Sequence, residues 1–414
     1  MRAAESVTLA GLDHDPHPLL ASLRDAAPVC WVPALGAWLV TGYHYAVDVL
    51  RNARTFTVDD PRFSTAKVVG PSMLSLDGAQ HARHRAPFSH AFRSEEVHAR
   101  LASFTRGEAV RLVTAVAPRG QADLRRDVAG PLAAAVMAKA LGLEDADPAQ
   151  ILTWYDGIVA AVQAAAAAQA TAIQAEAVAA KDATPGPVGT AGSAGTAAFT
   201  ELAASLRQVI TAARHRSLLT EAVTAQLTEA AAGPPLTADE AISNAAVLMF
   251  GGIETVEGMI SNAALHLLTH PGELELVRAD PDLVPAAIEE SLRLEPAAAV
   301  VDRYATADAT LAGVRIPAGE QVTVSIAAAN RDPAVFPDQD RYDVRRPNAS
   351  RHLAFAHGPH FCLGAHLARL EARVAIETLL DLLPQLRLDD RYPASPRGLV
   401  FRKPPYLRVR WNPA

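Results

Sequence analysis

The chain has little cysteine and no long hydrophobic run. Its only two cysteines among 414 residues are Cys30 and Cys362, and two cysteines cannot build a disulfide framework. The N-terminal stretch MRAAESVTLAGLDHDPHPLL contains no apolar run of the kind found in signal peptides. No segment has the roughly 20 consecutive apolar, uncharged residues that a membrane span needs. We therefore expect a cytoplasmic protein that folds in a reducing compartment and does not associate with membranes.

Positive charge is also scarce. The chain has 38 lysines and arginines against 45 acidic residues, which gives a formal net charge of −7. This balance lacks the basic excess typical of nucleic-acid-binding proteins. Half of the residues are hydrophobic, which is enough material for one large core.

The pattern of apolar residues predicts a mainly α-helical fold with minor antiparallel β sheets. Residues 94–270 read as a series of helices rich in Ala, Leu, Glu and Arg. We expect one domain over 1–414, with β-rich parts near 28–70 and 300–330 and a helical body over 80–295 and 364–384. A cluster of Gly, Pro, Thr and Ser at 181–198 indicates a flexible loop within this domain, although an interdomain linker has the same composition.

The longest helical signal runs from a capping box at Thr237 and Glu240 to about Leu268. A helix of this length crosses an entire domain. Two adjacent glycines, Gly251 and Gly252, lie in its middle. Each costs about 1 kcal/mol of helix stability relative to alanine. We therefore expect a bulky neighbour or a local distortion at this point.

Cys362 lies in the stretch FAHGPHFCLG, just before the predicted helix 364–384. The start of a helix stabilises a thiolate through the helix dipole and free N–H groups. Such a thiolate can be a nucleophile, a redox sensor or a metal ligand, whereas an isolated cysteine is more often a buried apolar thiol. Five specified positions favour a dedicated site; they are Phe355, Gly358, His360, Cys362 and Gly364.

This spacing resembles the haem-binding loop of cytochromes P450. The resemblance implies that haem b is bound between the long central helix and this loop, with Cys362 as the thiolate ligand of the iron. It further implies that Phe355 packs close to the ligand and that Gly364 allows a bulky neighbour to approach. The groups that would bind the haem propionates are His81, Arg85, Arg303 and His360. One departure is Ala356, where the family most often has glycine.

Two further motifs of the family occur in the expected order. GGIET in the long helix resembles the motif over the distal haem face, where Gly251 and Gly252 would leave room for dioxygen and substrate. The resemblance implies that Glu254 and Thr255 form an acid–alcohol pair that relays protons during oxygen activation. Glu290 and Arg293 correspond to a buried structural ion pair. The third member of that pair is one of three arginines, Arg341, Arg345 or Arg346.

The family's activity is to insert one oxygen atom of O2 into a small organic molecule. Here the resemblance implies an apolar substrate, such as a secondary metabolite, and a pocket lined by Met73, Val247, Phe250, Ala298, Ala299, Val301 and Phe401. Electrons would come from a ferredoxin or flavodoxin and an NAD(P)H-dependent reductase. The carrier would dock on the monomer around Cys362, where basic groups are offered by Arg83, Arg93, Arg351, Arg369 and Arg373. The 181–198 loop would form part of a lid.

Several alternatives stay open at this point. The protein can be a peroxide-using peroxygenase, or a haem-thiolate oxidase that couples, desaturates or demethylates its substrate. It can also be a non-catalytic haem-thiolate protein, or a redox switch without haem. Outside the motifs, we expect Cys30 to be a core thiol in an apolar strand. His14 and His17 have no matching metal ligands, and we expect both to be solvated.

Overall fold

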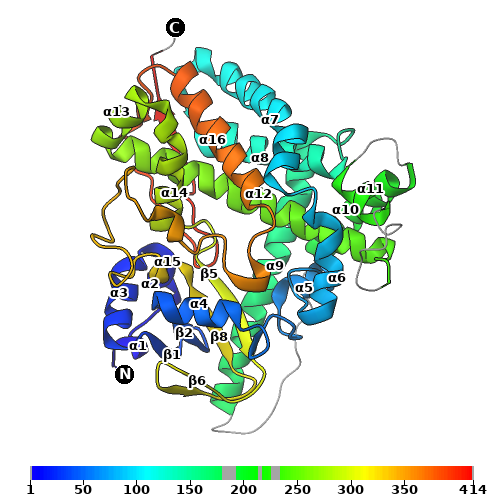
Figure 1. The fold of residues 1–414 in the computed structure, drawn as a ribbon, viewed down its shortest axis with the longest axis vertical. Coiled ribbons are helices and arrows are strands. Elements are labelled where there is room, and N and C mark those ends of the chain that lie inside the picture. The colour runs from blue at the N-terminus through cyan, green and yellow to red at the C-terminus, as the bar shows by residue number, and fades with distance from the viewer. Residues whose placement is uncertain (1, 180–192, 213–216, 225–233, 413–414) are drawn as a thin grey trace.

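A computed structural model describes residues 2–179, 193–212, 217–224 and 234–412. A helical body surrounds the long helix α12, and a small sheet lies beside the N-terminal helices (Figure 1). The helices are α1 (Arg2–Glu5), α2 (Leu9–His14), α3 (His17–Ala26), α4 (Tyr43–Arg51), α5 (Ser64–Val69), α6 (Gly78–Ser89), α7 (Ser94–Val116), α8 (Gly130–Leu141), α9 (Pro148–Ala179), α10 (Ser193–Ala212), α11 (Leu218–Thr224), α12 (Ala238–Thr269), α13 (Pro271–Ala279), α14 (Val284–Leu294), α15 (Ile326–Ala329) and α16 (Ala365–Leu382).

The strands of the described residues form three small sheets. They are β1 (Val29–Val32), β2 (Ala37–Val40), β3 (Phe56–Thr57), β4 (Gln121–Asp123), β5 (Val300–Ala305), β6 (Ala309–Leu311), β7 (Val314–Ile316), β8 (Gln321–Ser325), β9 (Arg387–Leu388) and β10 (Arg408–Arg410). The main sheet has the order β1-β2-β8-β5-β3, the second has the order β4-β10-β9, and β6 pairs with β7. One pairing differs from the expected antiparallel arrangement, because β2 and β8 run parallel.

Helix α12 is the centre of the main hydrophobic core. Its N-terminus carries the predicted capping box, in which the Thr237 hydroxyl accepts from the Glu240 N–H and the Glu240 carboxylate accepts from the Thr237 N–H. Apolar residues from α7, α8, α9, α12, α14 and α16 form one continuous buried cluster. Because α12 is buried on most of its surface, it has the character of an internal helix rather than a surface one.

Several local expectations need correction. Residues 193–198 belong to α10 rather than to a loop, and residues 181–192 of the predicted lid lie outside the described residues. His17 is not solvated, because its Nε2 atom lies 2.9 Å from the buried Glu295 carboxylate. Cys30 is only half-buried on the edge strand β1. Among the described helices, none is both long and apolar enough to cross a bilayer.

Candidate active site

The Cys362 loop is a tight bend that delivers the thiol to the start of α16. The Cys362 N–H donates to the Phe355 carbonyl at 2.8 Å, and Gly364 is the N-cap of α16. Gly358 has a φ of +74°, and a Cβ there would lie 2.5 Å from the Leu50 carbonyl oxygen. Only glycine fits this position. Ala356 has a φ of 58°, a left-handed conformation that costs an alanine about 1–2 kcal/mol.

The electrostatics around Cys362 combine burial with nearby positive charge. Burial raises the pKa of the Cys362 thiol, although the Gly364 N–H and the guanidinium groups of Arg85 and Arg369 act in the opposite direction. Arg85 also donates to the Phe361 carbonyl at 2.7 Å. Arg369 lies over the Phe355 ring at 4.4 Å. The guanidinium groups of Arg85 on α6 and Arg369 on α16 are therefore close enough to stabilise a thiolate. Such a thiolate forms when a metal ion replaces the thiol proton.

The four predicted propionate-binding residues converge beside this loop. The rings of His81 and His360 lie 4.3 Å apart, and the buried Arg303 comes from β5. The Nε2 atom of His81 is buried and has no hydrogen-bond partner among the residues that the structure describes. Burial, followed by the charges of His360 and Arg85, lowers the pKa of His81 to about 4. Burial likewise lowers the pKa of Arg303 to about 10.

A buried imidazole nitrogen without a partner and desolvated guanidinium groups are costly unless an anion satisfies them. Two propionates meet this need, because carboxylates accept charge-assisted hydrogen bonds from imidazole and guanidinium groups. The half-buried thiol of Cys362 supplies the ligand type that haem iron takes in haem-thiolate proteins. The residues present therefore fit haem b.

Asp77 is a member of this cluster that the sequence motifs did not reveal. Its carboxylate lies 2.8 Å from His360 Nε2 and accepts hydrogen bonds from the Thr57 hydroxyl at 2.7 Å and the Val58 N–H at 2.9 Å. Burial opposes ionisation of Asp77, but these bonds prevail and lower its pKa. The only sequence signal was its position at the N-cap of α6. Asp77 therefore links β3, α6 and the Cys362 loop.

The two glycines of α12 face different surroundings. A Cβ added to Gly251 would meet nothing within 4 Å among the described residues, whereas one added to Gly252 would lie 2.5 Å from the Met137 sulfur on α8. Gly251 therefore borders open space, and Gly252 allows two helices to pack closely instead of leaving room for dioxygen. The Thr255 hydroxyl donates to the Gly251 carbonyl at 2.6 Å, which fixes Thr255 next to that space.

Glu254 is buried, with 5 % of its surface exposed. Its carboxylate accepts a hydrogen bond from the Tyr155 hydroxyl of α9. Its other oxygen lies 2.8 Å from the Lys403 ammonium. Neither partner is part of a recognised motif, so the sequence alone did not point to them.

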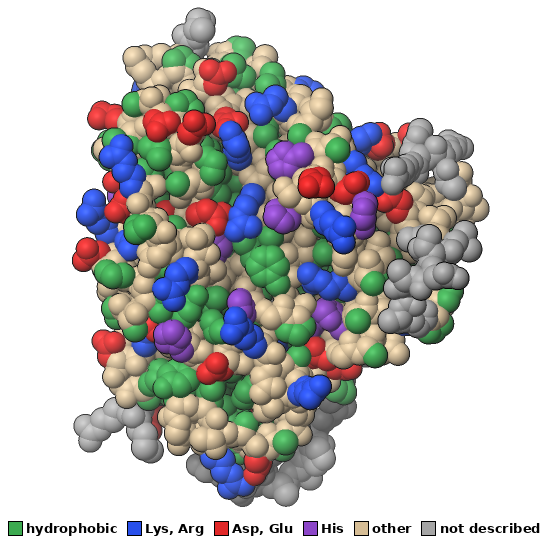
Figure 2. All heavy atoms as spheres, in the orientation of Figure 1, with side chains coloured by type: hydrophobic (Ala, Val, Ile, Leu, Met, Phe, Trp, Pro, Cys, Tyr) green, Lys and Arg blue, Asp and Glu red, His purple; other side chains and the backbone are tan. Residues whose placement is uncertain are grey.

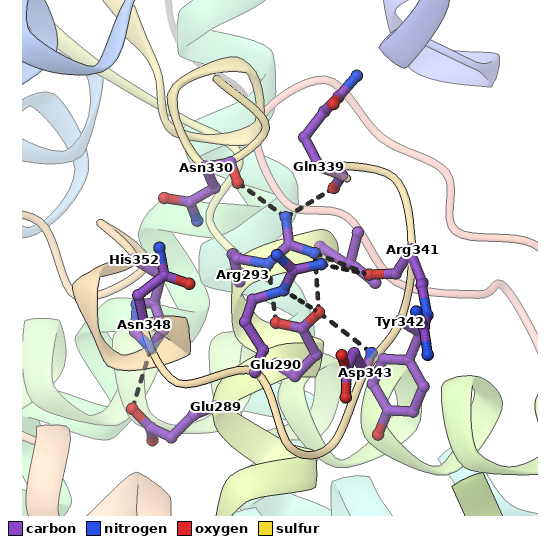
Figure 3. Close-up of polar contacts among 12 residues, drawn as sticks. Glu289, Glu290, Arg293, Asn330, Gln339, Arg341, Tyr342, Asp343, Asn348 and His352 are labelled. Carbon is purple, nitrogen blue, oxygen red and sulfur yellow. Dashed lines mark hydrogen bonds and ion pairs between the residues drawn. The ribbon is translucent and has the colours of Figure 1, made fainter. Parts of the chain in front are cut away.

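The structural ion pair is fully buried, and Figure 3 shows the Arg293 and Glu290 side chains facing each other. Arg293 donates through Nε and Nη2 to the two oxygens of Glu290, both at 2.8 Å. The third member is Arg346, whose Nε lies 2.8 Å from the Glu290 carboxylate. Arg341 contributes only its carbonyl, which accepts from Arg293 at 3.1 Å. This pair is structural because it is completely buried.

The predicted pocket residues divide into two groups. The rings of Phe250 and Phe401 meet edge to face with centroids 5.5 Å apart, and Ala298 forms a β-bridge with Phe401. Met73 and Val247 are buried in the same core cluster as Phe250. By contrast, Ala299 packs in a separate cluster with residues of α3, β1 and β2. Val301 packs against the cluster around α4. The apolar contacts of these two residues are therefore with the clusters around the main sheet.

Comparisons with known proteins agree with this geometry. Residues 28–406 match the family model for cytochrome P450. Cytochrome P450 monooxygenase PikC of Streptomyces venezuelae is 34 % identical over 421 residues, which cover 96 % of this chain and 91 % of PikC.

Solved structures show the same fold. P450BioI in complex with hexadec-9Z-enoic acid-ligated acyl carrier protein is 29 % identical, with a TM-score of 0.81 and coverage of 97 % of this chain and 100 % of that one. CYP109E1 from Bacillus megaterium in complex with testosterone is 27 % identical, with a TM-score of 0.81 and coverage of 96 % and 98 %. This chain belongs to the cytochrome P450 family and is a cytochrome P450 monooxygenase.

Proposed function

We propose that this protein adds one oxygen atom of O2 to a large apolar metabolite that lies over Gly251. The observation that carries the proposal is the open space beside Gly251, next to the aromatic pair Phe250 and Phe401. Val247, one turn from Gly251 on α12, is apolar like the aromatic pair, which favours a substrate held by burial of its own apolar surface. Two of the similar structures were solved with apolar molecules, testosterone and an acyl-carrier-linked fatty acid.

The residues have separate tasks in this proposal. When bound, the haem supplies the oxygen-activating chemistry, because its thiolate ligand donates electron density that favours O–O cleavage. Cys362 would hold the iron, and His81, Arg85, Arg303 and His360 would bind the two propionates. Thr255 lies at the edge of the open space and would hold a proton at its hydroxyl. Glu254, the next residue towards the helix N-terminus, would supply that proton.

The electron donor would be a small acidic carrier docking over the Cys362 loop. Lys, Arg and His side chains surround an apolar centre on the face shown in Figure 2. Phe361 is 43 % exposed beside Cys362, and Arg93 and Arg351 are also exposed. Three other arginines expected on this face are engaged, because Arg83, Arg369 and Arg373 each form an ion pair with a glutamate. The carrier would therefore meet fewer unpaired cations than the sequence suggested.

A titration experiment tests the proposed substrate class. The purified holoprotein is titrated with a panel of macrolides, steroids, long-chain fatty acids and small polar acids, and the spin-state change of the Soret band is recorded. We expect binding from the large apolar members and product formation with a surrogate ferredoxin and reductase. Binding confined to the small polar acids would overturn the proposal.

A variant tests the proton-relay role and separates it from peroxide use. Thr255→Ala is expected to consume NAD(P)H while losing most of the product. Full coupling in this variant would contradict the role of Thr255. Product formation driven only by hydrogen peroxide in the wild type would show a peroxygenase instead.

A further inference from the structure

Glu254 is part of a buried charge network that spans four segments of the chain. Glu254 and Glu257 lie one turn apart on α12, and Lys403 contacts both carboxylates. Arg125, from the π-helical turn Arg125–Ala129, donates to Glu257 at 3.1 Å. Tyr155 of α9 donates to Glu254 and accepts from Lys403 at 3.3 Å. The network therefore joins the turn Arg125–Ala129, α9, α12 and the segment that follows Phe401.

The charges of this network balance only when Lys403 is present. Glu254 and Glu257 are 5 % and 6 % exposed, and the Lys403 side chain is 11 % exposed. Two buried carboxylates are thus contacted by two cations, Lys403 and Arg125, while the nearby Asp156 carboxylate is exposed and lies outside this buried set. Arg125 reaches Glu257 alone, so Lys403 is the cation that neutralises Glu254. Buried carboxylates that lose their cation repel each other, and one of them moves or takes up a proton.

The orientation of Glu254 is set by partners outside its own helix. Its two oxygens are engaged by Tyr155 and Lys403. Thr255, in contrast, is held by the Gly251 carbonyl of α12 itself. The hydroxyl is therefore fixed locally, whereas the acid is fixed by α9 and by the C-terminal part of the chain. A shift of about 1 Å in a positioned group is enough to change a reaction rate greatly.

We propose that Lys403 and Tyr155 are positioning residues that hold the Glu254 carboxyl group in the orientation needed for proton supply to Thr255. This inference rests on the proposed proton-relay role of Glu254 and Thr255. Lys403 acts through its charge and Tyr155 through its hydroxyl. Neither residue needs to touch the substrate or the haem.

The experiment compares variants of the holoprotein. Lys403→Met removes the charge, Lys403→Arg keeps it, and Tyr155→Phe removes one hydroxyl with little risk to folding. Lys139→Met is the matched control, because Lys139 forms a partly exposed ion pair with Glu144 on the surface. For each variant we measure haem content, product formed per NAD(P)H, and the solvent deuterium isotope effect on product formation.

We expect normal haem content in all four variants. Product per NAD(P)H should fall at least about threefold in Lys403→Met and less in Tyr155→Phe, with a larger solvent isotope effect in both. Lys403→Arg should retain most of the coupling, and Lys139→Met all of it. Wild-type coupling in Lys403→Met and Tyr155→Phe, while Thr255→Ala is uncoupled, would overturn the inference and leave the proposed function standing. Coupled turnover in Thr255→Ala would instead refute the relay itself.

A second measurement does not depend on activity. A double-mutant cycle combines Lys403→Met with Glu254→Gln and follows urea unfolding of the holoprotein. If Lys403 neutralises Glu254, Lys403→Met destabilises the wild-type background more than the Glu254→Gln background. Additive effects of the two substitutions would show that the contact does not exist in solution, and would overturn the inference.

Discussion

His266 provides a pH-dependent test of the packing behind the site. Its Nδ1 atom lies 2.8 Å from the Ser291 hydroxyl, and its ring stacks on Tyr342 with centroids 5.2 Å apart. Burial, outweighing the attraction of Glu295, lowers the pKa of His266 to about 3. Folding therefore disfavours protonation of this imidazole as the pH falls from neutral.

The sign of the effect follows from linkage. An unfolded histidine has a pKa of about 6.5 and takes up a proton as the pH falls, whereas folded His266 does not. The contribution of His266 to the free energy of unfolding is fully present above about pH 6.5 and is lost as the pH decreases. Between pH 7 and pH 5 the free energy of unfolding falls by about 2 kcal/mol, because each pH unit below the unfolded pKa costs about 1.36 kcal/mol. Because part of the residue reaches the surface, we expect between about 1 and 2 kcal/mol.

The assay is urea unfolding of the wild type and of His266→Gln, followed by circular dichroism at pH 7 and pH 5. Other titrating groups and haem loss affect both proteins and cancel in the difference. The wild type should lose between about 1 and 2 kcal/mol more than His266→Gln over this range. His98→Gln is the control, because His98 is exposed on α7, and it should behave like the wild type. Equal pH dependence in the wild type and His266→Gln would refute the reasoning.

Three further predictions test other parts of the structure. Glu290→Ala leaves the buried guanidinium of Arg293 uncompensated and should cost about 3–5 kcal/mol in urea unfolding; a loss below 1 kcal/mol would contradict the buried pair. Gly251→Ala enters open space and should leave stability unchanged or raised, whereas Gly252→Val clashes with Met137 and should cost about 1–3 kcal/mol; equal effects would contradict the assigned faces. Arg303→Met should accelerate haem transfer to apomyoglobin about tenfold or more, because a charged hydrogen-bond donor is lost; an unchanged rate would remove Arg303 from the propionate site.

The sequence was sufficient to predict contacts between residues that lie close together in the chain. The capping box of Thr237 and Glu240 is set by local backbone geometry, and Glu290 and Arg293 are one helical turn apart. The bend around Gly358 follows from a backbone conformation that only glycine adopts easily. Such local rules do not depend on the rest of the fold.

The contacts that were missed join distant segments. The sequence did not distinguish between three arginines of one irregular segment, Arg341, Arg345 and Arg346. Only the folded chain brings Arg346 to Glu290. Asp77 and Lys403 reach their partners through tertiary packing that no spacing encodes. Ala298 and Ala299 have different neighbours because consecutive residues of an extended chain point to opposite sides.

The spectrum of the reduced protein with carbon monoxide tests the central claim, namely that the Cys362 thiolate binds haem iron. The wild type should show the strongly red-shifted Soret band of a thiolate-ligated haem, and Cys362→His should lose that band while retaining haem. A wild-type band at the position of imidazole-ligated haem, or an unchanged red-shifted band in Cys362→His, would contradict the account.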